Sequence, residues 1–447
     1  MPLKESASIV EDIDATPVAT IGTESTTTIA SENDSIKLLT FNTWGLKFIS
    51  KHRRQRIEAI AQKLCEEQYD IVALQEIWSE DDWKYFNQTC QTIYPYRRAF
   101  KSGIIAGPGL AILSKIPIDQ SFLYRFPING RPSAFFRGDW YVGKGISITT
   151  LKPHKKNALP IAILNSHMHA PYSKVGDASY STHRACQAWD FTKIVNMLKR
   201  SGFAVIQVGD LNSRPNSLPY NLFTVESQLI DSWRFLNPNE VSIAGLTPED
   251  QIITAGVTCN SQLNTYRTHS KIEDACRLDY ALIDINTITP LKAAVKFTEK
   301  LPAPLNCSYS DHFGYSIEFA VQSKDEHKTH DDRFISDPSE KIEIYQQLLI
   351  EIAEYRKHTI PFQSNWRKIY FFSSILITLS FYLFSGFQSR FAVLFLFLSH
   401  FILVTGILNG MIWFFGVRSE SRALQEVELE VEDAYFSLKT EMSHPST

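Results

Sequence analysis

The chain has 447 residues, with 45 Lys and Arg against 48 Asp and Glu, and six cysteines. This length allows two or three domains, and the near-zero net charge argues against a nucleic-acid binder that works through a broad basic face. The cysteines show no paired CxxC or zinc-binding spacing, so they fit a reducing compartment better than a disulfide framework. The average composition is that of a soluble protein, but two long apolar runs near the C-terminus exclude that class.

The first segment, residues 1–35, carries seven acidic side chains, eleven Ser and Thr, and no aromatic residue. Such a composition buries too little apolar area to offset the entropy of ordering, so a disordered tail is expected. The segment has no Arg and no apolar core, which argues against a signal peptide or a transit peptide.

Residues 36–322 are expected to form one large α/β domain. Helical periodicity is present at 52–67 and 183–200. The β-rich runs lie at 36–41, 70–75, 109–113, 146–151, 161–167, 204–210, 279–283 and 315–320. Many short strands with few helices between them favour two stacked sheets with helices outside over a strictly alternating parallel fold.

A polar linker and an amphipathic helix are expected over 323–366. The linker reads SKDEHKTHDD, and the helix begins near Ser339, with Ile342, Tyr345, Leu349 and Ile352 on one face. That face could pack on the domain, lie on a membrane or pair with another helix, and the sequence does not choose among these.

Two uncharged apolar runs follow, at 369–387 and 391–417, and they are 19 and 27 residues long. A bilayer core needs roughly 20 helical residues. A transmembrane helical hairpin is therefore predicted in preference to two buried core helices.

Basic residues at the ends of the runs set the expected orientation. Arg367, Lys368, Arg418 and Arg422 flank the outer ends, and Arg390 lies alone in the turn. Because basic residues concentrate on the cytosolic side of a membrane, the domain and the tail over 418–447 are predicted to be cytosolic.

Polar residues stand at the ends of the predicted strands in seven separate segments. They are Asn42, Glu76, the run from Asn165 to His169, Asp210 with Asn212, Asn264 to Tyr266, Asp279, and Asp311 with His312. Singly, each has an ordinary explanation such as a cap, a turn or a buried histidine. Taken together, these residues indicate one shared site, because strand ends on one sheet edge converge in space. Hard oxygen ligands at such an edge suit Mg²⁺. Histidines and an aspartate beside such an ion are the groups that activate water on a phosphodiester.

The ordered set N…QE…NSHxHA…GDLN…RLDY…SDH resembles the exonuclease–endonuclease–phosphatase superfamily over about residues 36–320. The resemblance implies the DNase I-like fold, a four-layer α/β/β/α sandwich of the α+β class, followed here by the C-terminal hairpin. It also implies that Glu76 is the principal Mg²⁺ ligand, with Asn42 and Asp311 close to the metal.

The same resemblance implies roles for the catalytic residues. His312 matches the general base, and Asp279 the carboxylate that orients it. Asp210 and Asn212 match the pair that positions the phosphate and the attacking water. His167 matches a histidine that stabilises charge on the phosphoryl oxygens.

The segment from Gly138 to Gly145, GDWYVGKG, nearly spells a nucleotide-binding P-loop. It lacks the final hydroxyl, and a strand-like run follows in place of a helix, so nucleotide binding is rejected. In sphingomyelinase-like enzymes a comparable segment with Asp and Lys five apart is implicated in activity. The resemblance thus implies substrate-binding roles for Asp139 and Lys144, with a surface ion pair as the alternative, and a supporting or substrate-binding role for His169.

Three features narrow the substrate class to membrane lipids. The hairpin holds the site near a bilayer, the aromatic residues of FPINGRPSAFFRGDWYVGKG suit a loop that faces an interface, and this string and NSHMHAPY resemble the neutral sphingomyelinase branch. Longer strings, such as KLLTFNTWGLKFISKHR, VGDLNSRP and ACRLDYALID, are similar to the fungal inositol phosphosphingolipid phospholipase C family.

The predicted activity is Mg²⁺-dependent hydrolysis of inositol phosphosphingolipids, and of sphingomyelin, to ceramide and a phosphorylated headgroup. A neutral sphingomyelinase that prefers sphingomyelin or lysophospholipid is the alternative, and a tethered non-catalytic adaptor or a nuclease is a weaker one. The resemblance implies activation by phosphatidylserine or cardiolipin. The near-zero charge and the hairpin argue against a nucleic-acid partner. The hairpin lengths are compatible with the endoplasmic reticulum membrane, and the resemblance adds mitochondria as a second possibility. Headgroup preference and oligomeric state stay open.

Overall fold

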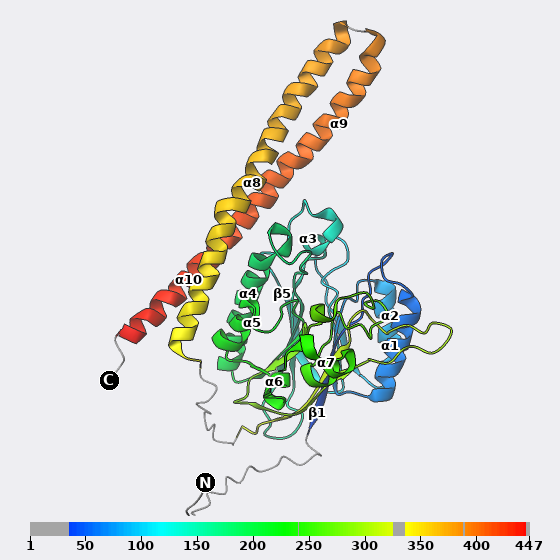
Figure 1. Ribbon diagram of the computed structural model, residues 1–447, viewed down its shortest axis with the longest axis vertical. Helices are drawn as coiled ribbons and strands as arrows, with labels where there is room; N and C mark the ends of the chain where they lie inside the picture. The colour runs from blue at the N-terminus through cyan, green and yellow to red at the C-terminus, as the bar shows by residue number, and fades with distance from the viewer. Residues whose placement is uncertain (1–34, 240, 325–335, 388, 444–447) are drawn as a thin grey trace, which may run out of the picture. The chain divides into compact units, whose positions relative to one another are not determined.

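The β-rich runs of the sequence form two six-stranded sheets in the computed structural model of the chain (Figure 1). The structure describes residues 35–239, 241–324, 336–387 and 389–443. The predicted tail before Ser35 and most of the predicted linker, residues 325–335, lie outside the described residues, and both stay predictions.

The first sheet has the strand order β11-β12-β1-β2-β4-β3. Its strands are β1 (Ile36–Asn42), β2 (Ile71–Gln75), β3 (Tyr96–Ala99), β4 (Ala111–Ser114), β11 (Ile288–Lys296) and β12 (Gly314–Val321). Strands β1 and β2 are parallel, and the other neighbouring pairs are antiparallel.

The second sheet has the order β5-β6-β7-β8-β10-β9. Its strands are β5 (Ile118–Arg125), β6 (Gly145–Leu151), β7 (Ile161–His167), β8 (Ala204–Asp210), β9 (Ile230–Asp231) and β10 (Asp279–Ile283). Here β7 and β8 are the parallel pair. Each sheet is therefore mainly antiparallel with one central parallel pair.

The eight runs predicted as strands are the eight interior strands of the two sheets. The four strands that were not predicted, β3, β5, β9 and β11, are the four sheet edges. An edge strand pairs on one side only and shows more of its surface to solvent, so its sequence lacks a continuous apolar run. Strand β5, for example, reads IDQSFLYR and has no fully buried residue.

Apolar layers join the sheets to each other and to the helices of the domain. Leu38 packs between the sheets, whereas its neighbour Leu39 packs against Ile57 of α1. In β7, Ile163 faces the first sheet and Leu164 faces α4. The helices of the domain are α1 (Arg53–Glu67), α2 (Glu80–Thr89), α3 (Asp139–Val142), α4 (Ser181–Arg200), α5 (Leu218–Asn221), α6 (Ser232–Leu236) and α7 (Pro248–Ala255). The alternation confirms the predicted four-layer sandwich.

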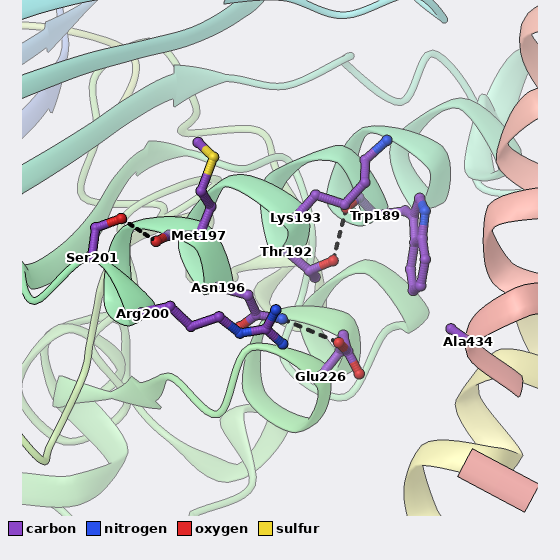
Figure 2. Close-up of a pocket in the computed structure, with 9 residues that line it drawn as sticks. All are labelled: Trp189, Thr192, Lys193, Asn196, Met197, Arg200, Ser201, Glu226 and Ala434. Carbon is purple, nitrogen blue, oxygen red and sulfur yellow. Dashed lines mark hydrogen bonds between the residues drawn. The ribbon is translucent and has the colours of Figure 1, made fainter. Parts of the chain in front are cut away.

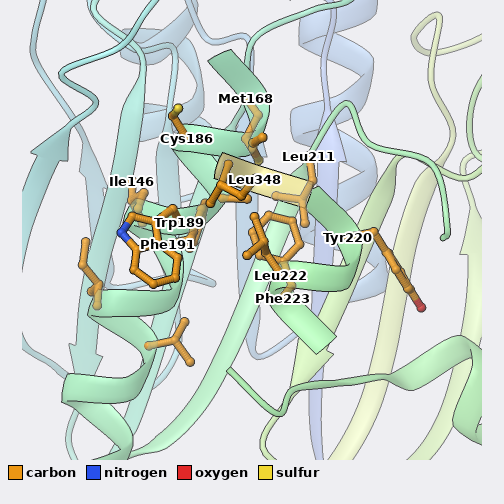
Figure 3. Close-up of a cluster of buried hydrophobic side chains, with 14 of the residues drawn as sticks. Ile146, Met168, Cys186, Trp189, Phe191, Leu211, Tyr220, Leu222, Phe223 and Leu348 are labelled. Atoms are coloured by element: carbon orange, nitrogen blue, oxygen red, sulfur yellow. The ribbon is translucent and has the colours of Figure 1, made fainter. Parts of the chain in front are cut away.

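Helix α8 (Pro338–Phe387) is one continuous helix of 50 residues, so the predicted amphipathic helix and the first apolar run are not separate elements. Its amphipathic face packs on the domain, where Leu348 lies among the side chains of α4, including Trp189 (Figure 3). The buried face differs slightly from the predicted one, because Ile344 and Leu348 are buried and Leu349 is half-buried. Helix α10 (Arg418–Ser443) packs into the same hydrophobic cluster and buries more of the apolar surface of the domain.

The apolar part of α8 pairs with α9 (Ala392–Met411), which continues through a wider helical turn, Ile412–Val417, into α10. Arg367 Nη1 donates to Asn409 Oδ1 at 2.8 Å, and Thr378 Oγ1 donates to Ser399 O at 3.3 Å, so the two helices run antiparallel. The two long helices each contain an 18-residue stretch that is strongly apolar and almost entirely exposed. By length and composition they are apolar enough to cross a membrane as a hairpin.

Candidate active site

The sheet register brings the polar strand ends together. In the second sheet, Asp210 at the end of β8 is level with His167 of β7 and Asp279 of β10. Asn42, at the end of β1 in the first sheet, connects the two sheets, because its amide Nδ2 lies 3.0 Å from both Glu76 Oε1 and Asp210 Oδ2. Asn42 thus contacts these acids as a donor, the geometry of a residue that positions them.

Glu76 follows β2 in a backbone conformation that residues other than glycine rarely adopt. Its φ is +61°, in the left-handed region, and such strain persists mainly where the surrounding structure and function require it. Burial and the nearby charge of Asp311 raise the pKa of Glu76 to about 7. Trp78 Nε1 donates to Glu76 Oε2 at 3.2 Å, so one hydrogen bond holds each carboxylate oxygen.

His312 and Asp279 form a buried pair next to Asp210. His312 Nδ1 lies 2.9 Å from Asp279 Oδ2, and His312 Nε2 lies 3.8 Å from Asp210 Oδ2. Burial alone would lower the pKa of His312, but the charges of Asp279 and Asp210 outweigh it and raise that pKa well above its ordinary value. The bond to Asp279 fixes Nδ1 as the donor, so Nε2 faces the acids and can exchange a proton there.

His167 lies between the two acids at the strand ends. Its Nε2 is 3.6 Å from Asp210 Oδ2 and 4.0 Å from Glu76 Oε1. Burial and the nearby charge of Lys144 lower the pKa of His167 well below its ordinary value, so the ring is neutral at physiological pH. A neutral imidazole can donate one hydrogen bond to a phosphoryl oxygen without itself adding a charge.

Asp311 is held by Arg267, which was not predicted. Arg267 Nη2 lies 2.6 Å from Asp311 Oδ2. The other oxygen, Oδ1, is buried and has no hydrogen-bond partner among the described residues. Arg267 directly follows the segment from Asn264 to Tyr266 that the sequence singled out, but a loop arginine carried no signal of its own.

Asp139 and Lys144 form a buried ion pair, so the alternative of a surface pair is wrong. Lys144 Nζ lies 2.7 Å from Asp139 Oδ1, and the two residues are 2% and 5% exposed. Tyr172, which was not predicted, donates to Asp139 Oδ2 at 2.6 Å, and His169 Nε2 lies 3.6 Å from the same oxygen. Burial would raise the pKa of Asp139, but the charge of Lys144 outweighs it and keeps that pKa below its ordinary value.

These groups border a cleft of about 500 Å³. Eight of the eleven predicted site residues line it, and Asn42, Asp279 and His169 lie behind them, each in contact with a residue that does. Trp44 and Arg137 also line the cleft and were not predicted. Another hollow of about 500 Å³ lies along α4 beside Ala434 of α10 and contains none of the predicted site residues (Figure 2).

The donor set fits a hard divalent cation. Asp210, Asp279 and His312 place one ligand atom each within 4.8 Å of one another, although His312 and Asp279 are bonded to each other. Glu76 and Asp210 are crowded acids with a raised pKa, and Asp311 Oδ1 has no partner among the described residues. A cation bound by these carboxylates would relieve both features, and oxygen ligands are those that Mg²⁺ and similar ions prefer.

Known proteins share this sequence pattern. Residues 39–312 match the model of the Endonuclease/Exonuclease/phosphatase family. Inositol phosphosphingolipids phospholipase C of Saccharomyces cerevisiae is 46% identical over 461 residues, which cover 94% of each chain. The protein of the same name from Schizosaccharomyces pombe is 38% identical over 64% of this chain and 69% of that one. Sphingomyelin phosphodiesterase 2 of Mus musculus is 35% identical over 42% of this chain and 44% of that one.

The family match begins in β1 and ends at His312, so it covers the whole second sheet, the first sheet up to β12, and every predicted site residue. The Saccharomyces cerevisiae relative aligns with nearly the whole chain. The chain therefore belongs to the endonuclease/exonuclease/phosphatase family, in the group that contains the inositol phosphosphingolipid phospholipases C and the neutral sphingomyelinases.

Proposed function

We propose that this enzyme hydrolyses the phosphodiester of inositol phosphosphingolipids at a membrane surface, with Mg²⁺ as cofactor, and releases ceramide and a phosphorylated headgroup. The observation that carries the proposal is the 2.9 Å pair of His312 and Asp279 facing Asp210 in the cleft. The 46% identity to a protein named for this activity supports the choice of substrate.

His312 acts as the general base in this proposal. Asp279 orients the ring, and a cation held by the nearby carboxylates would offset the negative charge that raises the pKa of His312, so that Nε2 can accept a proton from a water molecule. Asp210 stabilises the imidazolium that forms. The water oxygen forms a bond to phosphorus while the bond from phosphorus to the ceramide oxygen breaks. Ceramide leaves as an alkoxide and takes a proton from solvent, and the His312 imidazolium releases its proton to solvent, which restores the base.

The other residues position the phosphate and neutralise its charge. His167 donates to a phosphoryl oxygen, and Asn212 keeps the phosphate in line with the water. Glu76 would hold Mg²⁺, with Asp311 and Asn42 close by, and the ion would supply Lewis-acid stabilisation of the developing charge. Asp139, Lys144 and His169 support this wall of the cleft from behind or at its edge.

The helical hairpin formed by α8 and α9 is proposed to anchor the enzyme in the membrane that contains its substrate. Basic residues flank its outer ends, and this supports a cytosolic position for the catalytic domain. The endoplasmic reticulum is the first candidate membrane and mitochondria the second. Phosphatidylserine and cardiolipin are proposed as activators, and no nucleic-acid partner is proposed.

A second candidate function is a neutral sphingomyelinase that prefers sphingomyelin or lysophospholipid. The 35% identity to sphingomyelin phosphodiesterase 2 of Mus musculus favours it, and it would use the same catalytic residues. A non-catalytic adaptor is a weaker candidate, because Glu76, Asp210, Asp279 and His312 are all present in the cleft region.

One experiment tests the proposal. The detergent-solubilised full chain is incubated with Mg²⁺ and, separately, with inositol phosphoceramide, sphingomyelin and lysophospholipid, and the released headgroup is measured. We expect release from inositol phosphoceramide that stops with EDTA and in His312→Ala. Undiminished release in a folded His312→Ala protein would remove the proposed mechanism, and release from sphingomyelin alone would favour the second candidate.

A further inference from the structure

A larger cavity adjoins the active-site cleft on the side of α5. Its volume is about 750 Å³, and it shares Tyr172, Asn212, Asn260 and Leu278 with the cleft. Pro171 borders both spaces as well, so the cavity lies directly beside the residues that position the phosphate. The cavity is large enough for a sugar-sized ring.

The walls of this cavity are polar and balanced in charge. Lys174, Arg184 and Arg214 contribute three positive charges, and Glu273, Asp274 and Glu351 contribute three negative ones. Four serine hydroxyls also line it. A neutral ring with many hydroxyl groups needs both donors and acceptors at several points, and this wall supplies both.

The same wall is poorly suited to a quaternary ammonium group. Such cations bind against the faces of several aromatic rings. Tyr172 is the single aromatic residue among the described residues that line this cavity. The chemistry of the lining therefore favours a polyol headgroup over choline.

Arg214 is the residue best placed to read such a headgroup. It lies two residues after Asn212, and Tyr280 OH fixes the backbone between them by donating to Ser213 O at 2.6 Å. Arg214 Nη2 donates to Asp274 O at 2.9 Å, and no ion pair within the described segments involves its guanidinium. Its remaining N–H groups are donors at the mouth of the cavity, in a fork that can bind two neighbouring hydroxyls.

The loop from Pro132 to Arg137 connects the cleft to the apolar hairpin, because it contacts the hairpin near one end and lines the cleft at the other. Pro132 contacts the end of the second apolar run, where a Cβ on Gly416 would lie 2.7 Å from Pro132 Cγ. Phe135 and Phe136, three and four residues further along, are 60% and 100% exposed, and Arg137 lines the cleft.

We propose that this cavity is the headgroup site, that it takes a neutral polyol such as inositol, and that Arg214 determines the preference for a polyol over a choline headgroup. The inference rests on the proposed function and specifies which part of the enzyme reads the substrate.

The test compares two lipids in one assay with the full-length enzyme. Values of kcat/KM are measured for inositol phosphoceramide and for sphingomyelin in mixed micelles, for wild type, Arg214→Ala and Arg214→Lys. We expect Arg214→Ala to lose about tenfold or more on inositol phosphoceramide, mainly through KM, because hydrogen bonds from a charged group are lost. Activity on sphingomyelin should change by less than about threefold, and Arg214→Lys should be intermediate. Arg200→Ala, an exposed arginine in the hollow of Figure 2, is the matched control.

Inhibition by the released headgroups gives a second measurement, which does not depend on how fast a variant hydrolyses inositol phosphoceramide. Inhibition by myo-inositol 1-phosphate should weaken in Arg214→Ala, and inhibition by phosphocholine should not. Equal losses on both lipids, or unchanged activity on inositol phosphoceramide, would overturn the headgroup assignment while leaving the proposed function in place. A wild-type enzyme that releases headgroup from neither lipid would overturn both.

Discussion

Lys144 and Asn212 donate to the same acceptor. The carbonyl oxygen of Met168 lies 2.8 Å from Lys144 Nζ and 3.0 Å from Asn212 Nδ2. Lys144 is 2% exposed and also pairs with Asp139. From this position, Lys144 acts on the cleft by holding the Met168 backbone and, through it, Asn212, so a positioning role fits its contacts.

Replacing Lys144 by Met should therefore affect both stability and turnover. The substitution leaves Asp139 buried without its counter-charge, which should cost about 3–5 kcal/mol of unfolding free energy. Loss of the Met168 contact should lower kcat about 10–100-fold, as for other groups that orient a site. The melting temperature and kcat are measured in detergent, with Lys101→Met, an exposed partner of Glu80, as control.

The double variant Asp139→Asn with Lys144→Met separates these two effects. It removes the unpaired charge, so it should recover part of the lost stability but not the lost kcat. Wild-type turnover in Lys144→Met would contradict the positioning role.

Asp279 should be needed for turnover but not for folding. Asp279→Asn keeps the shape of the side chain, but its amide can hold His312 in the wrong tautomer, so kcat should fall about 10²–10⁴-fold. Asp284→Asn is the matched control, because Asp284 is also buried and follows the opposite end of β10. Comparable losses in the two variants would show that the effect comes from the strand and not from the His312 pair.

Metal binding should be visible without any measurement of activity. A cation that binds only the folded protein stabilises it by about 2.7 kcal/mol at 100 times Kd. We expect Mg²⁺ to raise the melting temperature of wild type over that in EDTA, and Glu76→Gln to lose most of this rise. Glu58→Gln on α1, whose partner is Arg54 on the surface, should keep it. An equal rise in the Glu76 variant would show that Glu76 is not a principal ligand.

Glu420 should make the docking of α10 on the domain sensitive to acid. Its Oε1 accepts from Tyr355 OH of α8 at 2.5 Å and lies 3.1 Å from His183 Nε2 of α4 and 3.5 Å from Arg131 Nε. Burial would raise the pKa of Glu420, but His183, Arg131 and Tyr355 outweigh it and lower that pKa below its ordinary value of 4.5. Asp177, bonded to Arg131, and the buried Arg367 of α8, which interacts electrostatically with Arg131 and Glu420, are further charged groups at this junction.

A carboxyl group whose pKa is lower in the folded protein than in the unfolded one stabilises the fold at every pH above its unfolded-state pKa. That stability is lost as the pH falls below about 4.5 and through the folded pKa. The melting temperature of wild type should therefore drop in this range. Glu420→Gln should be less stable at pH 7 and show a smaller drop, and parallel pH profiles for the two proteins would argue against this assignment.

The sequence predicted the interior of the sandwich and left out its edges. A strand such as β7 is buried on both faces and begins with the apolar run IAIL, whereas β5 reads IDQSFLYR and has no buried residue. The polar ends of the interior strands could be predicted for the same reason, since each residue follows directly from a recognisable run. Glu76 and Asp210 are of this kind.

Residues that reach the cleft from loops could not be predicted in this way. Arg267 and Tyr172 contact Asp311 and Asp139 only because tertiary packing brings their loops to the strand ends. The burial of Lys144 could not be predicted either, because nothing in the local sequence shows that Met168 and Asp139 contact its ammonium group. The continuity of α8 also depends on packing against α4 and α10.

The last prediction concerns the exposed pair Phe135 and Phe136. Pro132 contacts the hairpin at Gly416, so these two rings, 60% and 100% exposed, should enter the leaflet on the domain side, where the hairpin begins and ends, and hold the cleft at headgroup depth. The variant Phe135→Ser with Phe136→Ser should lower the rate on vesicle-bound inositol phosphoceramide about tenfold, yet keep the rate on a short-chain, water-soluble analogue. Ile253→Ser on α7, 69% exposed and unrelated to the cleft, is the control. Depth is measured independently with Phe136→Trp, whose fluorescence brominated lipids should quench. If quenching is absent, or if the double variant loses activity equally on both substrates, the two rings serve the fold of the loop and not its contact with the membrane.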